Sequence, residues 1–436
     1  MDYQLISEIL NAEMRLATGC TEPAAVALCA AYARQRLTGK PVKLAVEAST
    51  NIIKNAMSAG IPGSSRTGIP YAAAIGAFRA EPELELQIMD QVLPDVRAMA
   101  EQFVEQGRAS VSRKETTERL YIEVTLWSED AHQAKAVIAG SHTGLAYLEA
   151  DHIPIFRAEP GAGVNDISAD QIEQTLSIPA IYAFAQTLDP AIHDLHMIEQ
   201  AIEINARVAK EGSAEEYGLH IGRSMARYVK NGLFDQSVAM EAALRTACGI
   251  DARMGGANVP VVTNSGSGNQ GITATIPLLT AAELLHIDKD RTFRAITAAH
   301  LMSIYIHCRF GRLSPLCGAT VAGTGVACGL VFLLGGSAEQ MGYAVNNMLG
   351  TTAGILCDGA KPDCAMKVAA CVYTAFLAAQ MAMEHIGIPA DEGIVDADPA
   401  QTVRNFVRLG NEGSRDMDPV ILDIMLHKQG SVQTVR

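Results

Sequence analysis

Apolar and polar residues alternate at two places in the first third of the chain. The alternation runs over residues 42–47 and again over residues 120–126. A period of two is typical of half-buried β-strands, because successive side chains of a strand point to opposite faces. Residues 82–106, which lie between the two runs, carry a helical pattern instead. The first third of the chain therefore predicts a mixture of strands and helices.

The helical period dominates from about residue 165 onward. One helix face is predicted by the spacing of Met197, Ala201, Ile204 and Val208. Such a spacing of three and four residues places side chains on one side of a helix. Similar alanine-rich patterns continue to about Gly387, and residues 1–37 predict two more helices with a break at residues 18–20. A glycine- and proline-containing run at residues 158–163 is predicted to be a linker.

Together these patterns predict an α+β fold, with a mixed α/β domain inserted into a large, mostly helical domain rich in glycine and alanine. An N-terminal helical pair, residues 1–37, is expected to pack on the helical domain. The α+β domain is expected over residues 38–160 and the helical domain over residues 165–436. Small residues at helix contacts suit a dense bundle around a buried site.

Composition and charge narrow the class of protein. Of the 436 residues, 49% are apolar and 19% are charged, which excludes a disordered chain and a coiled coil. The net charge of −14 repels phosphate backbones and anionic lipid, so neither nucleic acid nor a membrane surface is an expected partner. The first residues lack the pattern of a signal peptide, and the number of cysteines, nine, is odd. We therefore expect a cytoplasmic protein whose cysteines serve a metal or catalysis.

An uncharged stretch at residues 317–336 is the best candidate for a membrane span. It contains six glycines and several threonines but no aromatic belt. This composition favours a close-packed, buried helix over a transmembrane helix.

Six of the nine cysteines lie between residues 308 and 371, namely Cys308, Cys317, Cys328, Cys357, Cys364 and Cys371. Cys328 and Cys371 lie in apolar surroundings and are assigned to packing. Cys357 and Cys364 flank a turn-forming segment in which Lys361 would stabilise thiolates, so they are candidate metal ligands. Without any C-x-x-C pair, an iron–sulfur cluster is favoured over zinc. The spacing leaves the third cysteine ligand open.

Polar residues cluster at several other points. Cys20 precedes a predicted helix, whose N-terminus favours a thiolate, whereas the neighbouring Glu22 opposes that effect. Thr21 is a candidate N-cap of this helix. His142 is a candidate proton carrier, although a single histidine is more often structural.

Two polar loops are candidate ligand sites. One follows the first predicted strand and carries Asn51, Lys54 and Asn55. The other, residues 263–271, is rich in glycine, serine and asparagine and precedes a predicted helix. Exposed backbone N–H groups in such a loop can bind a carboxylate or a phosphate.

Taken together, these segments resemble those of the bacterial and archaeal iron–sulfur L-cysteine desulfidases, a family related to the α-subunit of iron–sulfur L-serine dehydratases. The resemblance covers nearly the whole chain and lies in residues 19–23, 54–57, 61–63, 265–271, 311–314, 317–318, 357–361 and 364. It implies that Cys317, Cys357 and Cys364 hold a 4Fe–4S cluster with one iron left open. It also implies that Cys20 is the catalytic thiol or thiolate.

The resemblance predicts a lyase that eliminates the β-substituent of L-cysteine, giving pyruvate, ammonia and hydrogen sulfide. Cys20, or His142 through a water, would take the Cα proton. The candidate substrate-binding residues are Thr21, Glu22, Asn51, Lys54, Asn55, Asn264, Ser265, Gly266, Ser267 and Asn269. The expected partner is a small amino acid, and assembly into a homo-oligomer stays open.

Three alternatives remain at this point. The first is an L-serine dehydratase that uses the same cluster. The second is a pyridoxal-phosphate eliminase in which Lys54 forms the Schiff base, although this leaves Cys357 and Cys364 unexplained. The third is a non-catalytic iron–sulfur sensor, although neither a basic patch nor a signalling module is evident in the sequence.

Overall fold

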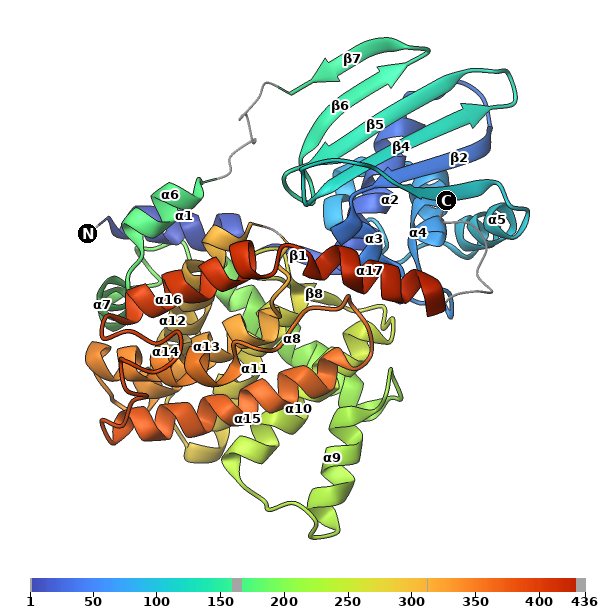
Figure 1. Ribbon diagram of the computed structural model, residues 1–436. Coiled ribbons are helices and arrows are strands. Elements are labelled where there is room, and N and C mark those ends of the chain that lie inside the picture. Colours follow the sequence, from blue (N-terminus) through green and yellow to red (C-terminus); the bar gives the residue numbers. More distant parts are fainter. Residues whose placement is uncertain (1, 159–166, 312, 429–436) are drawn as a thin grey trace.

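A six-stranded sheet forms the first of two packed regions (Figure 1). The computed structural model describes residues 2–158, 167–311 and 313–428. The sheet has the order β3-β2-β4-β5-β6-β7, in which β2 and β3 are parallel and every other pair is antiparallel. Its strands are β2 (Pro41–Ala48), β3 (Ala109–Arg113), β4 (Tyr121–Ser128), β5 (Gln133–Ala139), β6 (Leu145–Ala150) and β7 (Ile153–Arg157). The two alternating runs of the sequence correspond to β2 and β4.

The helices of this region are α2 (Thr21–Arg34), α3 (Thr50–Ala56), α4 (Ile69–Arg79), the short 3₁₀ helix η1 (Pro82–Gln87) and α5 (Pro94–Glu105). Helix α2 packs against α4 and against strands β4 and β5. The contact with α4 is close, because a Cβ at Gly76 would overlap the carbonyl oxygen of Ala27. On β4, Glu123 forms ion pairs with Lys114 and Lys135.

The second region is helical and is built around a separate apolar core. Its helices are α1 (Tyr3–Glu13), α6 (Ala169–Thr175), α7 (Ile178–Thr187), α8 (His196–Ala214), α9 (Ile221–Lys230), α10 (Val238–Met254), α11 (Gly268–Leu285), α12 (Lys289–His307), α13 (Gly318–Leu333), α14 (Ala338–Thr352), α15 (Cys364–Met383) and α16 (Pro399–Arg408). A mixed sheet beside a larger helical region is the α+β class that the sequence predicts.

The N-terminal helices differ from the prediction that both pack on the helical domain. Helix α1 contributes to the core of the helical region, but α2 lies in the core of the sheet region. The reason is the composition of α2, which is buried from Thr21 to Ala31 and is rich in small alanine side chains without a single apolar face. The last helix, α17 (Met417–Lys428), also leaves the helical region and packs against α3. The predicted domain boundaries therefore do not coincide with the limits of the two packed regions.

A short second sheet connects the two regions. Strand β1 (Leu16–Thr18) pairs antiparallel with β8 (Pro260–Val262), so the predicted break between the first two helices contains a strand. The segment that follows β8 lies beside the segment that precedes β1, and Ser265 N donates a hydrogen bond to the carbonyl oxygen of Glu13. The start of α2 is thereby held next to the glycine-rich loop. The predicted linker at residues 158–163 lies, apart from Ala158, outside the described residues.

The uncharged stretch at residues 317–336 forms α13, in which residues 319–333 are all buried. This confirms the prediction of a close-packed, buried helix. One described helix, α15, is long and apolar enough to span a membrane, and 44% of its most apolar window is buried. Helix α15 also packs against α10 and α13, and a single helix of this kind is weak evidence for a span.

Candidate functional site

A cavity of about 110 Å³ brings together the four cysteines that the sequence analysis singles out. Cys20, Cys317, Cys357 and Cys364 all line it. Its walls come from α2 and α3 of the sheet region and from α10, α11, α12, α13 and α15 of the helical region. The cavity therefore lies where the two packed regions meet.

The structure brings only part of the predicted site to this cavity. The predicted residues that line it are Cys20, Thr21, Glu22, Asn55, Gly266, Ser267, Asn269, Cys317, Cys357 and Cys364. The predicted residues that do not line it are Asn51, Lys54, His142, Asn264 and Ser265. Each of the second group has a different position in the structure, described below.

Four helices begin at the cavity. Cys20 is the N-cap of α2 and Cys317 is the N-cap of α13, whereas Cys364 is the first residue of α15. Ser267 is the N-cap of α11, where its side chain accepts a hydrogen bond from Gln270 N. The N-cap of α2 is thus Cys20 and not Thr21 as predicted. The positive ends of four helix dipoles favour an anionic ligand or thiolates in this place.

Burial acts on the cysteines in the opposite direction. Burial raises the pKa of Cys20 to about 12, with Arg253 lowering this pKa and Glu22 raising it. Burial also raises the pKa of Cys364 to about 11, and it raises that of Cys317 well above its usual value, with the charge of Cys357 adding to the effect. The helix N-terminus alone would favour a Cys20 thiolate, but burial outweighs it. Burial therefore favours the thiol form of these three side chains.

The donor set fits an iron–sulfur cluster better than a single ion. Over the described residues, no group of three or more His, Cys, Asp and Glu side chains is arranged to hold one metal ion. A single ion needs thiolates at about 2.3 Å, whereas a cluster distributes its cysteine ligands over several irons. Cys317 comes from one segment and Cys357 and Cys364 from another, and all three line one cavity. Thiolates are the ligands that clusters prefer, so these residues fit the group.

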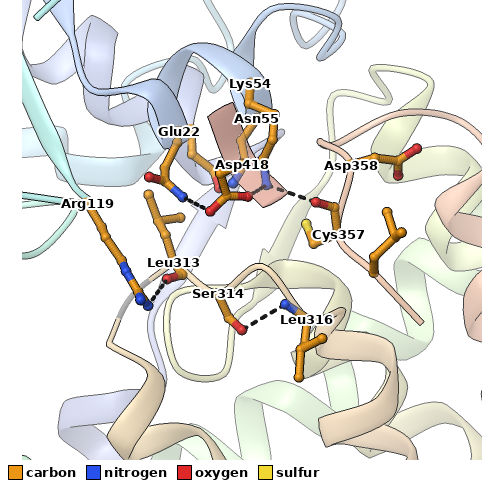
Figure 2. A network of polar contacts seen from close by, with 12 residues as sticks. Glu22, Lys54, Asn55, Arg119, Leu313, Ser314, Leu316, Cys357, Asp358 and Asp418 are labelled. Carbon is orange, nitrogen blue, oxygen red and sulfur yellow. Dashed lines mark hydrogen bonds and ion pairs between the residues drawn. The ribbon is translucent and has the colours of Figure 1, made fainter. Parts of the chain in front are cut away.

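Lys54 supports the segment that carries Cys357 (Figure 2). It is not among the residues that line the cavity. Its side chain is 0% exposed, and its Nζ donates hydrogen bonds to Asp418 Oδ1 at 2.6 Å and to the carbonyl oxygen of Cys357 at 2.8 Å. Asn51 Nδ2 donates to the other carboxylate oxygen of Asp418 at 2.5 Å. Lys54 and Asn51 are therefore occupied by Asp418 of α17. A Schiff base at Lys54 would break these contacts, which argues against the pyridoxal-phosphate alternative.

Two other lysines hold the same segment. Asp358 accepts hydrogen bonds from Lys361 and Lys367, and these outweigh the effect of burial and lower the pKa of Asp358. The charge of Lys367 opposes part of the rise that burial causes in the pKa of Cys364, whereas Lys361 is paired with Asp358 and Asp363. The lysine that favours the thiolates is thus Lys367, and not Lys361 as the sequence suggested.

The glycine-rich loop divides into a buried part and a part that lines the cavity. Asn264 is fully buried, and its Nδ2 donates to Nδ1 and to the carbonyl oxygen of His300 at 3.1 Å. Ser265, in a left-handed conformation, donates through Oγ to Asn264 Oδ1. These two residues hold the loop in place, while Gly266, Ser267 and Asn269 line the cavity.

His142 lies on a neighbouring, smaller cavity of about 30 Å³. Its neighbours there include Glu13 and Thr263, and Gly266 lines both cavities. His142 is 4% exposed. The structure therefore places it close to the site without placing it in the cavity of the cysteines, and its role as a proton carrier stays a prediction.

Four polar residues that line the cavity were not among the predicted site residues, namely Arg253, Gln270, His307 and Ser314. Arg253 Nη1 donates to Asn269 Oδ1 at 2.8 Å, and Arg253 Nε donates to the carbonyl oxygen of Gly19 at 3.1 Å. The burial of Arg253 becomes evident only in the structure, where it stands at the end of a helix whose residues from 246 to 254 are all buried. A charged residue in such a stretch needs a partner or a function.

The family model that matches this chain is described as the serine dehydratase alpha chain and matches residues 83–423. The match includes Cys317, Cys357 and Cys364 but begins after Cys20.

Relatives named UPF0597 proteins match almost the full length. The one from Oleidesulfovibrio alaskensis is 40% identical over 425 residues and covers 97% of each chain. The one from Photobacterium profundum is 38% identical over 421 residues, which is 97% of this chain and 98% of the relative. One from Bacteroides fragilis is also 38% identical, over 424 residues and with the same coverage of 97% and 98%.

Proposed function

Because this chain belongs to the serine dehydratase alpha chain family, we propose that it is a lyase that uses a 4Fe–4S cluster to eliminate the β-substituent of L-cysteine. The products are pyruvate, ammonia and hydrogen sulfide. The observation that carries the proposal is the cavity that Cys20 shares with Cys317, Cys357 and Cys364.

Cys317, Cys357 and Cys364 are the residues that would hold the cluster. When bound, a cluster with one iron free of protein ligands supplies a Lewis acid for the β-substituent. The helix N-termini at Cys317 and Cys364 favour the negative charge of the thiolates. L-cysteine is preferred over L-serine because a thiol suits soft iron better than a hydroxyl does.

Cys20 is the residue to which we assign the proton transfer at Cα. Removal of the Cα proton and departure of the β-substituent with its electron pair leave 2-aminoacrylate, which becomes an imine and hydrolyses to pyruvate and ammonia. Because burial raises the pKa of Cys20, its thiolate needs a neighbouring positive charge, and Arg253 is the residue that lowers this pKa. His142, on the neighbouring cavity, would exchange protons through a water.

Dehydration of L-serine by the same site is the second candidate, and the family description favours it. Both reactions remove the Cα proton, pass through 2-aminoacrylate and give pyruvate and ammonia. They differ only in whether sulfide or water departs. A single assay therefore separates them.

The deciding experiment is an anaerobic assay of the protein reconstituted with iron and sulfide. We expect sulfide and pyruvate in equal amounts from L-cysteine, and a smaller kcat/KM for pyruvate from L-serine. Cys20→Ala is the matched control, because it removes the proposed proton acceptor and keeps the three cluster cysteines. A larger kcat/KM with L-serine would establish the dehydratase instead. A protein that binds iron and converts neither amino acid would favour the sensor.

A further inference from the structure

Two buried side chains of opposite charge line the cavity without an ion pair. Arg253 is 5% exposed and Glu22 is 9% exposed. In the ranges that the structure describes, neither side chain has an oppositely charged group within ion-pair distance. A buried charge without a counter-ion is costly, and a ligand of opposite charge removes that cost.

The Arg253 guanidinium retains free donors toward the cavity. Its Nε and Nη1 are used for the carbonyl oxygen of Gly19 and for Asn269, whereas Nη2 has no hydrogen bond to any described residue. The group fits at this place because the loop has a glycine there: a Cβ at Gly268 would lie 2.6 Å from Arg253 Cζ. A guanidinium held in this way can bind a carboxylate through its remaining N–H groups.

The Glu22 carboxylate is oriented by its neighbours and keeps acceptor capacity. Oε1 accepts from Asn55 Nδ2 at 2.9 Å, and Oε2 accepts from Thr21 Oγ1 at 3.1 Å. A carboxylate has about four acceptor positions. Two further acceptors of the lining residues, Asn55 Oδ1 and Gln270 Oε1, are buried and have no hydrogen-bond partner among the described residues. Asn55 also contacts Glu22, so its free oxygen and the Glu22 carboxylate together form a pair of acceptors suited to an ammonium group.

We propose that Arg253 binds the α-carboxylate of the substrate and that Glu22, with Asn55, binds its α-ammonium group. This inference rests on the proposed function, because it describes how the same cavity selects a zwitterionic amino acid. A zwitterion matches both buried charges at once. A ligand that lacks either end would leave one of the two charges buried and uncompensated.

The test compares three thiols with the anaerobically reconstituted protein. L-cysteine has both charged ends, 3-mercaptopropanoate has only the carboxylate, and cysteamine has only the amine. Binding is measured by calorimetry and by competitive inhibition, together with kcat and KM for L-cysteine. The variants are Arg253→Gln and Glu22→Gln, with Arg253→Lys as a variant that keeps the positive charge.

We expect a crossed pattern of effects. Arg253→Gln should raise the KM for L-cysteine and should weaken the binding of 3-mercaptopropanoate roughly 10- to 100-fold, because a charged hydrogen bond is lost. The binding of cysteamine should stay unchanged. Glu22→Gln should weaken the binding of cysteamine and of L-cysteine to a similar extent and leave the binding of 3-mercaptopropanoate unchanged. Arg253→Lys should recover part of the carboxylate affinity. A general disturbance of the fold would weaken both analogues together.

The inference and the proposed function fail in different ways. If the wild type binds the analogues with the crossed pattern but releases no sulfide, the proposed reaction is wrong and the binding roles stand. If the wild type is active and each variant weakens both analogues equally, or neither, the binding roles are wrong. Failure of the wild type to bind any of the three thiols would overturn both.

Discussion

Lys54 joins Asp418 of the last helix to the main-chain carbonyl of Cys357, a proposed cluster ligand. The ammonium group is completely buried and lies 2.6 Å from the carboxylate and 2.8 Å from the carbonyl oxygen (Figure 2). Three segments that are remote in sequence thereby meet at one nitrogen atom. The position of Cys357 depends on this contact.

The first prediction concerns this ion pair. Lys54→Met should lower the free energy of unfolding by about 3–5 kcal/mol, because it leaves the Asp418 carboxylate buried without its positively charged partner. The double variant with Asp418→Leu should cost less than the sum of the two single variants. Chemical denaturation of the three variants measures this coupling. The control is Arg207→Met, which removes an exposed ion pair with Glu203 and should change stability by at most about 1 kcal/mol.

The second prediction concerns Gly359, which approaches Lys54 closely. Its φ is +101°, and a Cβ there would lie 2.5 Å from the carbonyl oxygen of Lys54. Gly359→Ala should therefore displace the segment of Cys357 and reduce the iron retained after reconstitution. Gly393 is the matched control, because its φ is also positive, at +61°, but a Cβ would meet nothing within 4 Å. Equal iron content in the two alanine variants would contradict the prediction.

The third prediction concerns the pH dependence of stability. His300 is fully buried against Asn264 and Thr275, and burial lowers its pKa to about 3. An unfolded chain binds a proton at His300 below about pH 6.5, whereas the folded chain does not. His300 should therefore reduce stability as the pH falls from about 6.5 toward 3, by about 1.4 kcal/mol per pH unit.

His300→Gln removes this titration while keeping polar atoms near Asn264 and Thr275. The difference in unfolding free energy between the variant and the wild type should be constant above about pH 7 and should change in favour of the variant below about pH 6. Denaturation at a series of pH values measures it. A difference that does not vary with pH would show that His300 is not held neutral in the folded protein.

The fourth prediction concerns the cysteines. Single changes of Cys317, Cys357 or Cys364 to Ala should each abolish most of the bound iron and the release of sulfide. Cys328→Ala is the control, since Cys328 is fully buried in α13 and does not line the cavity. Cys20→Ala should retain iron and lose activity. Loss of iron in the Cys328 variant alone would contradict this assignment.

Local patterns of apolar and polar residues were sufficient to predict the main helices and strands. The alternation of apolar residues predicted β2 and β4, and the spacing from Met197 to Val208 predicted α8. Helix α2 was assigned to the wrong packed region, because a helix of alanine on all sides does not indicate which neighbour covers it.

In the site too, short motifs could be recognised from the sequence, whereas contacts between residues remote in sequence could not. The motifs around Cys20 and Cys357 indicated residues that line the cavity. Lys54 was assigned to the substrate, because nothing in its own segment points to Asp418, which follows 364 residues later. Arg253 was missed because its role depends on Gly19 and Asn269, which the fold brings to it. Partners set by tertiary structure cannot be derived from a short motif.

The most direct measurement is the content of iron and acid-labile sulfide in the wild-type protein after anaerobic reconstitution and removal of unbound metal. The account predicts about four irons and about four sulfides for each chain, as a 4Fe–4S cluster requires. A protein that retains neither iron nor sulfide, while its fold remains intact, would contradict it.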